Sequence, residues 1–581
     1  MIARLSSFLL PLACFASKGQ AQSQRKNNSA TDVEAIINRG IDALGGLDNI
    51  QAINSVTYTG NTILRSKTIM LAISLGGLDQ FGVTSGRQNI TFSFDQSHVK
   101  QRIDKFAQLG PNFSFGRASL DPMDFSLLIE GGDDGFAAVV QGSYDMYNPG
   151  GEPSGYTDGR TLGQLHDQRG LQVGSASAGK GKFSSALSLR PIQDDGLTFD
   201  VFQVLEHQNA TYRVEKTVAG TEFPTVYDGT TGLAVLLDPD THLPHIIRSY
   251  EDHPFFGPST NDLLVYNYAE VDGVQFPQRF KTIYNGRQVV ADFVADQVST
   301  NVEGIEESFA RPGNGTVPQS SAPIRDPEYS FAEIGEMAAV FLWPGAYSGT
   351  VEAMDAVATQ PYQDVPGLWI LNEALRQAVI ELEDGSVIVL DAPPHQSKVV
   401  IEWVRQKLGK NVTHVWPTHH HHDHAFGVVD YVAAGAKIII PEHAVEYYSN
   451  LNLTQGQAVT YKRGGSITLK DTKTQLTLVD MQATLHAVDH GYAVIQPACV
   501  TANSSTSVFE ADHANQDFIN TFDHGLIQEL TDALNRDRVP LSAHLFPVHG
   551  ADGNLTAFID PLGAKYPSYS PLDFVHGESS C

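Results

Sequence analysis

Residues 412–424 read VTHVWPTHHHHDH, an apolar strand pattern followed at once by a run of histidines. Two residues rotate by about 200° around a helix axis, so histidines two positions apart cannot share a helical face. In extended chain they point to the same side. His419 and His421 can therefore converge on one ion, while His420 and His422 face elsewhere.

The end of this run predicts a second ligand group. Asp423 and His424 lie where the chain turns into the next helix, and they can approach a second ion beside the first. Fifteen of the 21 histidines follow Pro394, so metal chemistry is expected in this half of the chain. A solvated histidine run, a metal-sequestering tract and a cloning tag are the alternatives. The interrupting aspartate, the preceding strand and the spaced downstream histidines favour a catalytic metal site.

The hydrophobic pattern around the motif alternates between strands and helices. Strand patterns cover residues 386–391, 412–416 and 437–440. Helical patterns cover 400–408 and 428–434, and each ends at a glycine. Strands and helices in alternation with short joins predict a layered α/β domain.

The N-terminal half has a different pattern. Apolar residues between 33 and 44 recur at helical spacing and stop at Gly45-Gly46, which predicts one amphipathic helix. Asn285-Gly286 between two strand patterns predicts a hairpin, and the Gly/Ser-rich stretch 148–181 predicts a long surface loop. Strand patterns occupy 56–59, 90–94, 199–204, 280–284 and 289–294. We expect a mainly antiparallel β domain that contains no chemical cluster of its own.

The motif His419-x-His421-x-Asp423-His424 follows Asp391-Ala392-Pro393 and precedes separated His, Asp and His residues. In this it resembles the metallo-β-lactamase superfamily of metal-dependent hydrolases. The resemblance covers roughly residues 330–575 and implies an αββα sandwich. The N-terminal half resembles the lipoprotein-like domains found ahead of some of these hydrolases, but without a sharp motif.

The resemblance also implies a ligand set for two metal ions. One ion takes a later histidine beside His419 and His421, and that histidine is His486 or His490. His544 is the rival to the last ligand, and Asp391 is implied to orient a ligand histidine. The preferred ligands are His419, His421, Asp423, His424, His486, Asp512 and His549, with Asp512 as the bridging carboxylate.

The implied chemistry is hydrolysis by a metal-bridging hydroxide. Imidazole and carboxylate ligands suit two Zn²⁺ ions, and iron or manganese are the alternatives. The hydroxide attacks the carbonyl of a small-molecule ester, lactone, thioester or amide-like substrate, and Asp423 orients the nucleophile or passes its proton to the leaving group. A mononuclear iron enzyme that oxidises thiols or persulfides, and a non-catalytic metal-binding protein, are the competing functions.

Some residues depart from the family pattern or lie outside it. Phe426 stands where the family often has a glycine, and it is expected to narrow or re-aim the pocket wall. His414 is expected to pack on its strand, and His443 to begin a surface helix. His513 and His524 lack the family spacing.

The domain boundaries follow from composition. Residues 1–21 combine Arg4, an apolar segment and small residues, and they predict a signal peptide. The β-rich domain is predicted at 31–310, a Pro/Gly/Ser-rich linker at 311–327, and the catalytic domain at 328–575. The apolar segment of the signal is too short to cross a bilayer. We therefore expect a secreted protein without a membrane span.

Charge and cysteine content limit the partners. The 581 residues include 66 acidic and 38 basic ones, for a formal net charge of −28, which disfavours nucleic acid as a partner and a nuclease function.

Cys499 and Cys581 can pair, or Cys499 can be buried beside a free terminal thiol, and the sequence leaves both open. The oligomeric state is also left open. Nine sequons predict glycosylation, at Asn27, Asn89, Asn112, Asn209, Asn314, Asn411, Asn452, Asn503 and Asn554.

Overall fold

The structure is a computed structural model. It describes residues 30–66, 74–75, 84–94, 99–108, 123–130, 136–142, 153, 155–157, 210–216, 220–228, 233–312, 347–482, 484, 486–514, 524–579 and 581. The predicted signal peptide, the predicted strand at 199–204 and residues 313–327 of the predicted linker lie outside these ranges. Among the described residues, no helix combines the length and the apolar character that a bilayer crossing needs.

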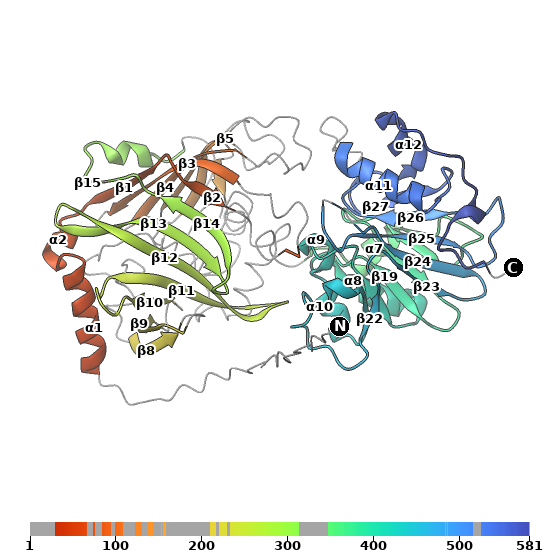
Figure 1. Ribbon diagram of the computed structural model, residues 1–581, viewed down its shortest axis with the longest axis horizontal. Coiled ribbons are helices and arrows are strands. Elements are labelled where there is room, and N and C mark those ends of the chain that lie inside the picture. The colour runs from red at the N-terminus through yellow and green to blue at the C-terminus, as the bar shows by residue number, and fades with distance from the viewer. Residues whose placement is uncertain are drawn as a thin grey trace, which may run out of the picture.

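The N-terminal domain is one large antiparallel sheet with two leading helices (Figure 1). The helices are α1 (Ala30–Ala43) and α2 (Leu47–Gln51). The strands are β1 (Ser55–Gly60), β2 (Leu64–Ser66), β3 (Thr84–Phe94), β4 (Val99–Gln108), β5 (Met123–Glu130), β6 (Phe136–Gln141), β7 (Gly155–Thr157), β8 (Ala210–Lys216), β9 (Glu222–Asp228), β10 (Leu233–Leu237), β11 (Pro244–His253), β12 (Gly257–Val271), β13 (Val274–Tyr284), β14 (Gln288–Val294) and β15 (Gln297–Thr300). Their order is β7-β6-β5-β4-β3-β2-β14-β13-β12-β11-β10-β9-β8, and β1 pairs with β3 and β15.

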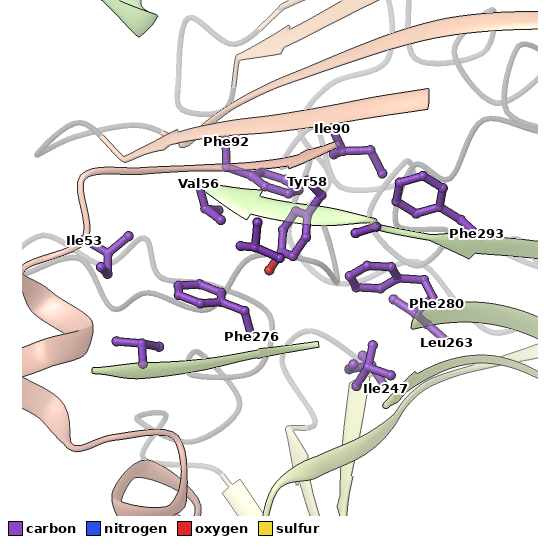
Figure 2. Close-up of a cluster of buried hydrophobic side chains, with 14 of the residues drawn as sticks. Ile53, Val56, Tyr58, Ile90, Phe92, Ile247, Leu263, Phe276, Phe280 and Phe293 are labelled. Carbon is purple, nitrogen blue, oxygen red and sulfur yellow. The ribbon is translucent and has the colours of Figure 1, made fainter. Parts of the chain in front are cut away.

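An aromatic cluster fills the concave side of this sheet. Tyr58 is fully buried, and the edges of its ring contact Phe276 and Phe280 from β13 and Phe92 from β3 (Figure 2). Helix α1 adds Ile36 and Ile37 to the same cluster. Alternate strand residues supply the cluster because successive side chains in a strand point to opposite faces.

The C-terminal region contains two further sheets. The helices are α7 (Val351–Val357), α8 (Gln396–Trp403), α9 (His422–Ala425), α10 (Val428–Ala433), α11 (His524–Arg536) and α12 (Leu555–Ile559). The first sheet holds β16 (Ala358–Thr359), β17 (Leu368–Leu371), β18 (Gln377–Glu381), β19 (Val387–Leu390), β20 (His414–Trp416), β21 (Lys437–Pro441) and β22 (Ala458–Tyr461). The second holds β23 (Ser466–Lys470), β24 (Thr474–Asp480), β25 (Gly491–Pro497), β26 (Ser507–Glu510), β27 (His544–Pro547) and β28 (Gly553–Asn554).

Period-two burial arranges these elements as an αββα sandwich. On β19, Ile388 and Leu390 join the core between the two sheets, while Val387 and Val389 join the core under the helices α8 and α10. A third core lies between the second sheet and the helices α11 and α12. The predicted α/β layered fold for the C-terminal region and the predicted antiparallel domain before it are confirmed.

Several local predictions can be compared with the elements. The helix before Gly45-Gly46 and the Asn285-Gly286 hairpin are present. The predicted loop at 148–181 contains the short strand β7, which pairs with β6, so that part of the prediction was wrong. Glycine spacing alone did not show that this segment extends the sheet edge.

The chain end is fastened to the second sheet. Cys499 and Cys581 form a disulfide across 82 positions of sequence. Glu578 N donates to Gln475 Oε1 at 2.9 Å, and Phe574 is buried in the core with α11 and α12. Of the two arrangements that the sequence left open, the structure contains the paired cysteines.

We expect Cys581→Ser to destabilise the chain. Opening a loop of this length releases unfolded-state entropy worth up to about 4 kcal/mol. The free energy of unfolding in urea should fall toward that limit, and Cys499→Ser should give the same loss, with no further loss in the double variant. Unchanged stability in all three variants would contradict a structural role for the bond.

Candidate metal centre

The predicted ligands come from strand ends that meet at one edge of the sandwich. Asp391 follows β19, and His419 follows β20, its parallel neighbour in the first sheet. Asp512 follows β26, and His549 follows β27, its parallel neighbour in the second sheet. Parallel strands place their carboxyl ends at the same edge, so residues far apart in sequence meet there.

Asp391 fixes the orientation of His424. Asp391 Oδ1 accepts hydrogen bonds from Thr418 N at 3.0 Å and Thr418 Oγ1 at 2.9 Å. Asp391 Oδ2 accepts from His424 Nδ1 at 2.6 Å, and both side chains are fully buried. Because Nδ1 of His424 carries the proton, the lone pair of Nε2 points to the opposite side.

Four imidazoles converge on Asp512. Asp512 Oδ2 lies 2.8 Å from His424 Nε2, 3.3 Å from His486 Nε2 and 3.4 Å from His419 Nε2. Asp512 Oδ1 lies 3.3 Å from His549 Nε2. One carboxylate therefore faces ring nitrogens from both predicted ligand groups.

The first ligand group is built from facing imidazoles. His419 Nε2 and His486 Nε2 are 3.2 Å apart. The ring centroid of His421 lies 4.4 Å from that of His419 and 4.7 Å from that of His486. The extended backbone at His421, with φ −60° and ψ 148°, places His419 and His421 side by side, as the spacing predicted.

The second ligand group combines Asp423, His424, Asp512 and His549, whose ligand atoms all lie within 4.8 Å of one another. Asp423 Oδ2 is 3.2 Å from His424 Nε2 and 3.4 Å from His549 Nε2. His424 Nε2 and His549 Nε2 are 3.2 Å apart. The two groups meet at Asp512.

Two of the central carboxylates sit on unusual backbone. Asp391 has a φ of 71° and Asp512 a φ of 66°, the left-handed region that a side chain with a Cβ rarely adopts. Aspartate tolerates it better than most residues. Such backbone gathers at functional sites, where the surrounding structure holds it in place.

At the centre, burial and neighbouring opposite charges shift the pKa values of the side chains in opposite directions. Burial raises the pKa of Asp512, but the charges on His424, His486 and His549 outweigh it and hold the pKa well below its usual range. Burial lowers the pKa of His424, but the three carboxylates around it outweigh that effect and raise the pKa. The region stabilises anionic carboxylates and a positive charge among them.

The structure treats the two rivals to the predicted ligands differently. His490 stays an open alternative: a ring nitrogen of His490 lies within 4.8 Å of those of His419 and His486, and its ring stacks on that of His419 at 4.5 Å. Its Nε2 also lies 3.1 Å from Glu510 Oε1. His544 contacts Asp552 at 2.6 Å, and neither residue belongs to the two ligand groups.

The structure also shows where His414, His443 and His524 lie. His414 is half-buried on β20 and contacts Thr413 Oγ1, as expected for a packing residue. His443 lies in a short 3-10 turn (Glu442–Ala444), half-buried and hydrogen-bonded to Val488 O, so the expectation of a surface helix start was wrong. His524 begins α11.

Phe426, the residue that departs from the family pattern, packs in the core of the C-terminal region. Its ring packs 5.7 Å from Phe255 within the buried apolar core of the first sheet. Phe255 belongs to the N-terminal domain, which is why no pattern near residue 426 revealed this partner.

Sequence reasoning missed a buried cluster beside the first ligand group. Glu510 Oε1 lies 2.8 Å from His513 Nδ1 and 3.1 Å from His490 Nε2, and all three side chains are fully buried. The available signal was the pair Glu510 and His513 flanking Asp512 in sequence.

One comparison with known proteins matches part of the C-terminal region to a family. Residues 377–496 match the family model described as the metallo-beta-lactamase superfamily. No curated protein matches the chain.

Solved structures give weaker likenesses. A B3 metallo-beta-lactamase with an active-site glutamic acid is 16% identical over 37% of this chain and 93% of its own, with a TM-score of 0.27. A metallo-beta-lactamase from Pontibacter korlensis is 14% identical over 36% of this chain and 96% of its own, also at 0.27. A metallo-beta-lactamase from Pseudomonas aeruginosa in a mono-zinc form is 16% identical over 36% of this chain and 92% of its own, at 0.26.

The sequence match lies within the sandwich and includes the complete His419–His424 motif and His486, whereas Asp512 and His549 follow it in the chain. On that match, residues 377–496 are similar to the metallo-beta-lactamase superfamily, and they lie in a region that has the αββα arrangement expected from this similarity.

Proposed function

We propose that this protein is a metal-dependent hydrolase that binds two divalent cations, zinc by preference, at the candidate metal centre. The substrate is a small molecule with an ester, lactone, thioester or amide-like bond. The family match supports metal-dependent hydrolysis as the general class, and the arrangement of side chains around His424 carries the proposal.

The lone pair of His424 Nε2 faces negative charge. Its Nδ1 proton is engaged by Asp391, so Nε2 of the neutral ring can only accept. Asp512 Oδ2 at 2.8 Å and Asp423 Oδ2 at 3.2 Å can also only accept when they are ionised. A buried contact between acceptors is unfavourable unless a proton or a cation lies between them. The same demand for positive charge raises the pKa of His424.

The donor set fits two cations. His419, His421 and His486 would hold one, and Asp423, His424 and His549 the other, with Asp512 shared. Imidazole nitrogen and carboxylate oxygen are preferred zinc donors. Asp391 would act on the second ion through His424, because such hydrogen bonds orient a ligand and raise its basicity.

The side chains then have separate roles in hydrolysis. A bound pair of such cations would supply an acidified water and polarise the scissile carbonyl. Asp423 is the candidate to orient the attacking water or to carry its proton at Oδ2, because this carboxylate borders the cluster and its side chain is 11% exposed. The charge of His424 and its hydrogen bond, with that of His549, outweigh burial and hold the pKa of Asp423 well below its usual range. Asp423 is therefore ionised at neutral pH, so Oδ2 can accept a hydrogen bond from the attacking water and orient it.

We also propose that the protein is secreted. The disulfide between Cys499 and Cys581 suits an oxidising compartment. Exposed sequon asparagines on the described surface are compatible with glycosylation, at Asn411, Asn452, Asn503 and Asn554.

Metal removal tests the two-cation proposal. We expect the purified protein to contain two zinc ions per chain by mass spectrometry, to lose hydrolysis of a lactone, thioester and ester panel after chelation, and to regain it on addition of zinc. One iron per chain with thiol oxidation would instead support the mononuclear alternative. Bound zinc with no turnover would support a non-catalytic binding protein.

A histidine pair tests the ligand assignment. His549→Ala should lower kcat by roughly 100-fold or more, beyond the loss that outer-shell changes cause, and should reduce the metal content. His544→Ala is the matched control. This histidine begins β27, the strand that His549 follows, but it contacts Asp552 outside the cluster. Both variants should keep the far-UV circular dichroism of the parent. Equal activity in the two variants would contradict the assignment.

Acidification should release the metal before the chain unfolds. Ligand histidines bind as neutral rings, and free histidine titrates near pH 6.5, so protons displace the cation as pH falls, with loss expected around pH 4–5. Metal content after dialysis at each pH should fall in that range and return at neutral pH with added zinc. Zinc and activity retained well below pH 4 would show that the site is more protected than these contacts suggest.

A further inference from the structure

The N-terminal domain contacts the metal-binding loop directly. The hairpin that joins β11 to β12 extends toward the C-terminal region (Figure 1), and residues 253–256 at its tip meet that region. A second contact comes from Ser74 and Leu75. The hairpin tip contacts His422, and Ser74 and Leu75 contact His420. These are the two histidines interleaved among the predicted ligands.

Phe255 at the hairpin tip belongs to the apolar core of the first sheet. Its side chain is fully buried, and its ring centroid lies 5.9 Å from that of His422 and 6.1 Å from that of Tyr448. His253 Nδ1 accepts from Phe255 N at 3.1 Å and from Phe256 N at 3.3 Å, which fixes the shape of the tip. The tip is therefore a rigid, desolvated contact.

His420 links the two parts of the chain through both ring nitrogens. Leu75 N donates to His420 Nε2 at 3.2 Å, so Nε2 is an acceptor without a proton. The proton of the neutral ring is then on Nδ1, which donates to Asp489 Oδ1 at 2.6 Å. Both nitrogens are engaged, which explains why this histidine does not join the ligands on either side of it.

The hydrogen bond to Asp489 continues this link to the loop that carries His486. Asp489 lies three positions after His486, and its side chain is buried. The same loop is held by His443 Nε2, 2.9 Å from Val488 O. A path of contacts therefore runs from Leu75 through His420 to the loop that supplies a candidate ligand.

We propose that the N-terminal domain positions the metal-binding loop, with His420 and His422 as the positioning residues that receive its contacts. This inference rests on the proposed metal centre and gives the β domain a role in it. Metal ligands bind well only when their own partners hold them in place. Here some partners of the interleaved histidines lie in another domain, so the loop has all of its supporting contacts only when that domain is docked.

A pair of phenylalanine variants separates docking from stability. Phe255→Leu removes ring contacts at the docking site, and Phe280→Leu makes the same change in the interior cluster of the β domain. The rate of zinc loss to an excess of chelator, read by mass spectrometry, should rise roughly 10-fold in Phe255→Leu. Phe280→Leu should lower the melting temperature and leave the rate unchanged. Equal rates in both variants would overturn the proposal.

Two variants of His420 separate its two hydrogen bonds. Asparagine places an amide nitrogen near the position of Nδ1, so His420→Asn keeps the bond to Asp489 and loses Leu75. Glutamine places an amide oxygen near Nε2, so His420→Gln keeps the contact with Leu75. We expect His420→Asn to lose zinc faster than wild type. The rate of zinc loss in His420→Gln should lie between those of wild type and His420→Asn. Faster loss in His420→Gln than in His420→Asn would overturn the proposal, since the bond within the C-terminal region would then dominate.

The rate of zinc loss is measured without substrate. A wild-type protein that binds zinc but hydrolyses nothing in the panel would therefore refute hydrolysis and leave this comparison valid. If both Phe255→Leu and His420→Asn lose zinc at the wild-type rate, the proposal that the N-terminal domain positions the loop is refuted, even if the protein is a fully active hydrolase.

Discussion

The hydrogen bond from His424 to Asp391 constrains the whole metal centre. It requires an ionised carboxylate in a fully buried position, which is costly unless every lone pair has a partner. Thr418 supplies two of those partners from the start of the histidine motif itself. The strand end, the motif and the second ligand group are therefore interdependent, because a shift in any one of them would leave Asp391 buried without compensation.

The local part of this centre could be predicted from sequence, and the distant part only through resemblance. Extended backbone places His419 and His421 on one side, and that rule needs no other part of the chain. His486, Asp512 and His549 converge because two sheets bring their strand ends to a common edge, which no periodicity reveals. A layered α/β domain could be anticipated from the alternation of strand and helix patterns, and the adjacent residues Ile388 and Val389 do serve two different cores.

The contacts of His420 were beyond sequence reasoning for a different reason. Its partner Ser74 is 346 positions away and belongs to a domain in which no chemical cluster was expected. The same holds for Phe255, whose neighbours in sequence give no sign of burial in another domain. Interdomain packing depends on complementary shape, and shape is a property of the assembled surfaces. The pairing of Cys499 with Cys581 was undecided because it too depends on where the chain end lies.

The left-handed backbone at Asp391 and Asp512 has an evolutionary consequence. Asparagine adopts this conformation about as readily as aspartate does, and its amide is nearly the same size as the carboxylate. Replacement of either acid by its amide would remove the negative charge and leave the turn geometry satisfied. The fold thus offers a short route from a working centre to an inert but well-folded descendant, and relatives that carry Asn at these two positions would be the first to examine for lost chemistry.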